Sequence, residues 1–122
     1  MSEQTDTPVY KLLRWLRERI KTPPFSELAR REAGYLLGQV QTGELLSMPA
    51  SRPLPSVGKR CHELRVRDEN INWRVVYRID ATRIVIASVF AKQSKTQQQL
   101  EFTKCKARLK AYDARVASGE EP

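Results

Sequence analysis

Three stretches of this chain have the side-chain pattern of β-strands. Residues 61–67 and 73–79 alternate with a period of two, and residues 83–91 are apolar on both faces, as a central strand should be. Only residues 68–72 and 80–82 separate these stretches, so consecutive strands must run antiparallel. A three-stranded antiparallel meander is therefore the framework into which the remaining segments have to fit.

Two helices flank the predicted meander. Ser26 is a suitable N-cap, apolar residues then recur at helical spacing, and Gly43 occupies a C-cap position, which predicts a helix over about residues 26–42. The proline-containing segment 43–60 is expected to be an irregular connection. A last helix is predicted from about residue 96 to residue 117. Its apolar stripe consists of Phe102, Cys105, Leu109, Tyr112 and Val116.

The order of these elements defines the fold class. A helix, a meander and a second helix in one chain of 122 residues predict a small single domain of the α+β class. We expect an antiparallel meander of three to four strands packed against an N-terminal helix and a C-terminal helix. Residues 10–117 would form this domain, with residues 1–9 and 118–122 as disordered tails.

Composition excludes several classes of protein. Lys and Arg number 22 against 14 Asp and Glu, and this net charge of +8 predicts attraction to nucleic acid, an anionic membrane or an acidic partner. We find no apolar run long enough to span a membrane and no signal-type hydrophobic segment near the start, so a cytoplasmic location is expected. Two cysteines and one histidine are too few for a zinc site, and no nucleotide-binding fingerprint occurs, so neither metal nor cofactor is expected.

The polar face of the meander carries a group of basic residues. If the apolar positions of the first two strands point at the helices, the arginines occupy the opposite face together with Glu63. Two interpretations are open: a solvated charged face, or a phosphate-binding surface. We favour the second because arginines on rigid strands are pre-organised for bidentate contacts with phosphate. The basic residues assigned to this surface are Arg65, Arg67, Arg74, Arg78, Lys92 and Lys95.

The remaining residues with chemical potential are interpreted as packing residues. His62 shares the parity of the apolar face, which favours a structural over a catalytic role. Cys61 and Cys105 are expected to be small core residues. Trp15 and Trp73 are also expected in the core, with base stacking by Trp73 as an open alternative.

Four motifs, taken together in this order and spacing, resemble the RelE/ParE toxin superfamily, and most of all its HigB-like, phage-derived branch. They are CHELRVR (61–67), WRVVYR (73–78), VFAK (89–92) and KARL (106–109). The resemblance covers about residues 10–115. It implies the toxin of a type II toxin–antitoxin system, which binds a cognate antitoxin, often one with a helix-turn-helix, and cleaves mRNA on the ribosome without metal.

The resemblance also implies roles for individual residues. Arg65 and Arg74 match the basic strand positions of the family and would stabilise charge on the phosphate in the transition state. Arg67 and Lys92 would position the RNA. Glu63 would be either the general base or a partner of Arg78. We find no counterpart of the tyrosine or histidine that some relatives carry near the C-terminus for acid–base chemistry.

For the segment 9–20, the residue pattern predicts a helix, whereas the family resemblance implies a strand. Its apolar residues have helical spacing, and Pro23-Pro24 would end such a helix. In the family the chain opens with a strand that pairs into the sheet, which implies that residues 12–16 form a strand. We follow the family here, because pairing in the folded protein often overrides local propensity.

Two other functions stay open. A ParE-like protein would keep this fold and bind gyrase without nuclease activity. A non-catalytic phage regulatory protein would use the arginines only to hold a nucleic-acid backbone.

Overall fold

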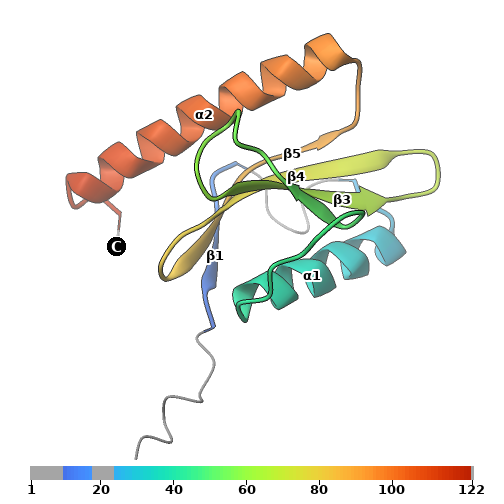
Figure 1. The fold of residues 1–122 in the computed structure, drawn as a ribbon, viewed down its shortest axis with the longest axis horizontal. Coiled ribbons are helices and arrows are strands. Elements are labelled where there is room, and N and C mark those ends of the chain that lie inside the picture. Colours follow the sequence, from blue (N-terminus) through green and yellow to red (C-terminus); the bar gives the residue numbers. More distant parts are fainter. Residues whose placement is uncertain (1–9, 18–23, 122) are drawn as a thin grey trace, which may run out of the picture.

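The computed structural model describes residues 10–17 and 24–121. Within these residues a five-stranded sheet in the order β1-β5-β4-β3-β2 lies between two helices (Figure 1). This is the predicted single α+β domain. In chain order its elements are β1 (Leu12–Trp15), α1 (Glu27–Gln41), β2 (Ser51–Pro53), β3 (Cys61–Arg67), β4 (Asn72–Ile79), β5 (Arg83–Ala91) and α2 (Lys95–Ala117).

The predicted meander forms the centre of the sheet. β3 pairs antiparallel with β4, and β4 pairs antiparallel with β5. The two connections are the short polar segments 68–71 and 80–82, which leave the strands no other arrangement. Ser26 caps α1 as predicted, because its side chain accepts a hydrogen bond from the backbone N–H of Ala29.

Two strands extend the sheet beyond the meander. β1 pairs in parallel with β5, with Leu13 opposite Ile84, so the strand implied by the resemblance is confirmed and the helix suggested by local spacing is wrong over these residues. β2 was not expected, since its segment was predicted to be irregular. It pairs with β3, with Ser51 opposite Leu64, and the Ser51 hydroxyl lies 2.8 Å from that of Tyr77.

The two helices cover opposite faces of the sheet (Figure 1). Leu37 of α1 belongs to one buried cluster with Leu64 and Ile86, whereas Leu109 of α2 belongs to a second cluster with Val76 and Val85. The expectation that the arginine-bearing face is turned away from the helices is therefore wrong. On that face arginines alternate with apolar residues. The apolar stripe of α2 is buried by packing against those apolar residues.

The residues interpreted as packing residues are packed. Cys61 and Cys105 are buried, and burial raises the pKa of both thiols. His62 stacks on Tyr77 with ring centroids 5.3 Å apart, and partial burial lowers its pKa. Trp73 is buried edge-on against Phe25, which leaves no ring face open to a base.

The start of α1 is held by the turn between β3 and β4. The Asp68 carboxylate accepts hydrogen bonds from the backbone N–H of Ser26 at 2.9 Å and from the Trp73 indole at 3.2 Å. The bonds from Ser26 are the main cause that lowers the pKa of Asp68 from 3.8 to about 2. One ionised carboxylate thus connects α1, the turn and the core.

We expect this carboxylate to make stability depend on pH in the acid range. Because the folded pKa lies below the unfolded value, the stabilisation is complete above pH 3.8 and is lost as the pH falls toward about 2. Asp68→Asn should flatten the decrease in the free energy of unfolding over that interval, measured by urea titration at a series of pH values. Glu69→Gln, in the same turn, should leave the decrease unchanged; equal curves for wild type and Asp68→Asn would contradict this account.

The ends of the chain are only partly described. Residues 1–9, which were predicted to be a tail, lie outside the described residues, and the assignment of tails stays a prediction. Glu121 accepts hydrogen bonds from Arg14 at 2.6 Å and from Arg115 at 3.3 Å, which joins the end of the described chain to β1 and α2. Neither of the described helices is long and apolar enough to cross a membrane.

Candidate anion-binding site

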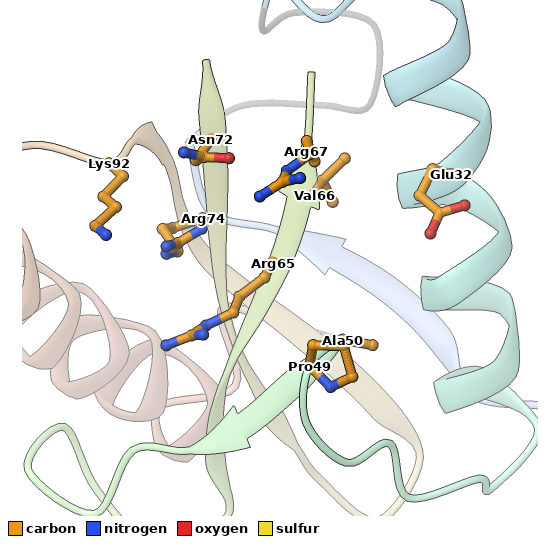
Figure 2. A pocket seen from close by; sticks show the side chains of 9 residues that line it. All are labelled: Glu32, Pro49, Ala50, Arg65, Val66, Arg67, Asn72, Arg74 and Lys92. Carbon is orange, nitrogen blue, oxygen red and sulfur yellow. The ribbon is translucent and has the colours of Figure 1, made fainter. Parts of the chain in front are cut away.

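A hollow of about 580 Å³ lies beside the last residues of β3, where β3 extends beyond its pairing with β2 (Figure 2). We call it the arginine hollow. Its basic lining comes from two neighbouring strands and from the residue that follows β5: Arg65, Arg67, Arg74 and Lys92. The other lining residues are Glu32 on α1, Pro49 and Ala50 before β2, Val66 on β3 and Asn72 on β4.

Arg65 and Arg74 face each other across the β3–β4 ladder. Figure 2 shows their side chains on the same side of the two strands, with Lys92 beyond them. Like charges directly opposite each other in a sheet are destabilising. A buried carboxylate offsets this repulsion: Oε1 of Glu63 lies 3.6 Å from Nε of Arg65 and 3.8 Å from Nε of Arg74, and the Glu63 side chain is fully buried.

A third arginine contacts the same carboxylate and was missed by the sequence analysis. Arg52 on β2 donates from Nε to Oε1 of Glu63 at 2.8 Å, and the two residues are register partners. No sequence signal identified Arg52, because its strand is three residues long and contains Pro53. Glu63 therefore has three guanidinium groups around it.

Burial distinguishes Arg74 from the other cations of the site. Its side chain is 9% exposed, and Nη1 donates to the carbonyl oxygen of Trp73 at 3.2 Å. Desolvation is the main cause that lowers the pKa of Arg74, Glu63 opposes this effect, and Arg65 and Arg52 add to it. An arginine remains charged at neutral pH under such conditions, so Arg74 presents a fixed and poorly hydrated positive charge.

Two buried polar atoms near the hollow lack a hydrogen-bond partner within the described residues. They are Oε2 of Glu63 and Nε of Arg65. The Arg65 side chain is otherwise partly exposed at 31%, while Arg67 and Lys92 are exposed. The arginine hollow thus combines one buried cation, one half-buried cation and two exposed cations, a set suited to an anion with several oxygen atoms.

The structure brings together most of the predicted site residues but not all. Arg65, Arg67, Arg74 and Lys92 line the hollow, and Glu63 lies beneath it. Lys95 is exposed at the first turn of α2 and is not among the lining residues.

Arg78 lies at the far end of β4, where it binds two carboxylates. It donates to Asp80 at 2.7 Å and to Asp113 at 2.8 Å, and these bonds raise its pKa. Of the two roles considered for Glu63, that of a partner of Arg78 is therefore wrong. The two residues share a face, but Arg78 lies opposite Cys61 at the start of β3 rather than opposite Glu63.

The hollow offers strong charge stabilisation and few groups for proton transfer. None of the nine described lining residues is a histidine, tyrosine or cysteine. Apart from the arginines, Glu32 and Lys92 are the lining side chains that can exchange a proton. Within the described residues, no cluster of three or more His, Cys, Asp or Glu side chains could hold a metal ion.

The structure is thus a small α+β sheet domain with an arginine-lined hollow at one end of its sheet. Residues 23–110 match the protein family described as Phage derived protein Gp49-like (DUF891), and the chain belongs to this family. The family is associated with RelE/HigB-type toxins. The matched range includes every residue that lines the arginine hollow. Neither the curated proteins nor the solved structures gave a match.

Proposed function

We propose that the chain is the toxin of a type II toxin–antitoxin system, of the HigB-like branch, and that it cleaves mRNA on the ribosome in the cytoplasm. The observation that supports this most is the facing pair Arg65 and Arg74, held over the buried Glu63 inside a hollow that is open to solvent. Pre-organised cations of this kind stabilise charge that develops on a phosphate during reaction. Membership of a toxin-associated family gives the proposal its biological context.

In the proposed reaction the RNA supplies the nucleophile, which is its own 2′-hydroxyl group. The 2′-oxygen of one ribose attacks the adjacent phosphorus, a P–O2′ bond forms, and the P–O5′ bond breaks. The proton of the 2′-hydroxyl leaves to a base, and the 5′-oxygen receives a proton as it departs. The products are a 2′,3′-cyclic phosphate and a 5′-hydroxyl.

The residues of the arginine hollow have different roles in this proposed reaction. Arg65 and Arg74 stabilise the negative charge on the non-bridging oxygens, and the exposed Arg67 and Lys92 hold neighbouring phosphates. Glu63 was predicted as a possible base. Its carboxylate is fully buried against three arginines, which favours a role in positioning Arg65 and Arg74 over direct contact with RNA.

A specific observation also favours a second candidate function. Because the described lining residues lack histidine, tyrosine and cysteine, the hollow could hold a phosphate backbone without cleaving it. Expression of the protein in bacteria, followed by mapping of new mRNA 5′ ends, separates the candidates. Growth arrest with in-frame cleavage of translated mRNA supports the nuclease, growth arrest with intact mRNA supports a gyrase-binding toxin, and no arrest supports a regulatory nucleic-acid-binding protein.

The chemistry of the cleavage gives a sharper prediction. A substrate with a single 2′-deoxyribose at the scissile position should not be cleaved, because it lacks the nucleophile. The all-ribose control should yield 2′,3′-cyclic phosphate ends, and its cleavage should survive EDTA once the magnesium requirement of the ribosome is controlled for. Mass spectrometry of the fragments checks the ends. Cleavage of the deoxy substrate, or activity that needs added Mg²⁺ or Mn²⁺ at the protein, would contradict the mechanism.

The proposal includes a partner. A net charge of +8 would bring the free protein to cellular RNA at any time, so a toxin of this kind needs a protein that covers part of its surface. We propose a cognate antitoxin, of the helix-turn-helix type that the family resemblance implies, with an acidic or amphipathic contact segment.

A further inference from the structure

A second hollow, of about 470 Å³, lies between α2 and the loop that precedes β3. It shares no lining residue with the arginine hollow. Its floor includes the apolar residues Val57 and Leu109, and its rim carries Lys59, Lys106 and Lys110. We call it the lysine hollow.

The rim lysines of this hollow come from α2 and from the loop that precedes β3. Lys106 and Lys110 are four residues apart on α2 and so lie on the same side of that helix. Lys59 precedes Arg60, a residue with a left-handed backbone (φ 63°). Arg60 is tied to the end of β4, because its Nε donates to the carbonyl oxygen of Ile79 at 3.0 Å. This bond anchors the backbone next to Lys59, which lines the hollow together with residues of α2.

The three lysines carry positive charge that the described protein does not neutralise. Each is exposed, and the described residues form no ion pair with any of them. Arg78, which also lines this hollow, is already paired with Asp80 and Asp113. Like charges at the i and i+4 positions of a helix are destabilising, so the proximity of Lys106 and Lys110 lowers the stability of α2.

The chemistry of the lysine hollow fits an acidic protein segment better than a nucleic acid. Its floor is apolar, so it can take an aliphatic side chain that a phosphate backbone lacks. The described lining residues include no aromatic ring on which a base could stack.

We propose that the lysine hollow is the docking site for an acidic, amphipathic segment of a protein partner. An aliphatic side chain of that segment packs over Ala107 and Leu109, and flanking carboxylates pair with Lys59, Lys106 and Lys110. The identity of this partner as the antitoxin rests on the proposed function, whereas the docking site itself does not. A partner bound here leaves the arginine hollow unfilled, so inhibition would require a further part of the partner to reach it.

The first test compares binding of two probes of equal formal charge by fluorescence anisotropy. One is a labelled helical peptide of glutamates with a single stripe of leucines, and the other is a labelled oligouridylate. A third probe, the same peptide with glutamines in place of the leucines, measures the contribution of the apolar floor. We expect the leucine peptide to bind tightest, and the glutamine peptide to bind about tenfold more weakly.

Matched variants locate the binding. Lys110→Glu should weaken binding of the leucine peptide by about tenfold or more, because a close charge pair becomes a repulsion. Lys104→Glu makes the same charge change at an exposed position of α2 that does not line the hollow, and it should have less than about a twofold effect. Ala107→Arg adds a positive charge but fills the hollow. It should weaken binding if the segment enters the hollow and strengthen it if attraction is only long-range.

The results separate this inference from the proposed function. Circular dichroism confirms that each variant is folded, and the RNA cleavage assay is run on the same samples. Peptide binding that Lys110→Glu and Ala107→Arg weaken supports the docking site whether or not the protein cleaves RNA. Equal effects of Lys104→Glu and Lys110→Glu, or tighter binding to Ala107→Arg, would overturn it. Tighter binding of the oligouridylate, weakened by Lys110→Glu, would overturn it in favour of a second nucleic-acid site.

Discussion

Arg74→Ala is expected to slow RNA cleavage by about 10²–10³-fold, the usual effect of removing one pre-organised group that stabilises charge in a transition state. Arg74 is the most buried cation of the arginine hollow and lies opposite Arg65 on the neighbouring strand. Its charge is therefore poorly screened by water and fixed in place before RNA binds. Rates of cleavage on programmed ribosomes, at equal concentrations of folded protein, measure the effect.

The burial of Arg74 also affects the design of this experiment. A surface substitution would leave stability almost unchanged, but removal of Arg74 leaves a void beside Glu63 and should cost about 1–3 kcal/mol. Arg74→Lys keeps the positive charge but lacks the planar guanidinium group. Relative to Arg74→Ala, we expect it to restore the stability of the fold more fully than the rate of cleavage. Arg31→Ala, at an exposed position of α1, is the matched control and should retain full activity. Wild-type cleavage by folded Arg74→Ala would remove Arg74 from the site.

Glu63→Gln is expected to lower the free energy of unfolding by about 3 kcal/mol or more, which is the range for removal of one partner from a buried charge cluster. The substitution keeps the shape of the side chain but leaves Arg52, Arg65 and Arg74 around a neutral amide. Their mutual repulsion is then no longer offset. Urea unfolding monitored by tryptophan fluorescence measures the change.

A matched carboxylate serves as the control for Glu63. Glu69 is exposed in the turn between β3 and β4, so Glu69→Gln should change stability by less than about 0.5 kcal/mol. A second substitution, Arg52→Met, made together with Glu63→Gln, should restore part of the loss, because it removes one of the three repelling charges. If Glu63→Gln is as stable as wild type, the carboxylate does not hold the arginines together.

The parts of the fold that could be predicted are those fixed by local pattern. The meander followed from alternation and two short turns, and the first helix from its N-cap and spacing. The side of the sheet that α2 covers could not be predicted, because both faces of β5 are apolar and either can receive a helix. β2 could not be predicted either, since three residues with a proline contain no readable period.

The candidate site was predictable to the same extent. The placement of Arg65 and Arg74 on one face of the sheet was predicted from strand parity, whereas their direct pairing in register is shown only by the structure. Arg52 was missed because it reaches Glu63 from a strand whose position depends on contacts between distant residues. Arg78 was assigned to the same surface by parity alone, but the carboxylates of Asp80 and Asp113, one of them on α2, engage it elsewhere.

Three guanidinium groups surround one buried carboxylate, which leaves a surplus of positive charge. This surplus affects how tightly the substrate, the transition state and the product of the proposed reaction are bound. A phosphodiester and a cyclic phosphate each carry one negative charge, so the surplus cations bind substrate and product about equally. The pentacoordinate state between them gains a second negative charge. A cluster whose positive surplus is fixed in advance favours that state over both neighbours, which is the only kind of binding that accelerates the chemical step. If the proposed reaction is correct, the carboxylate beneath the arginines sets how strongly their charge favours the transition state over bound RNA.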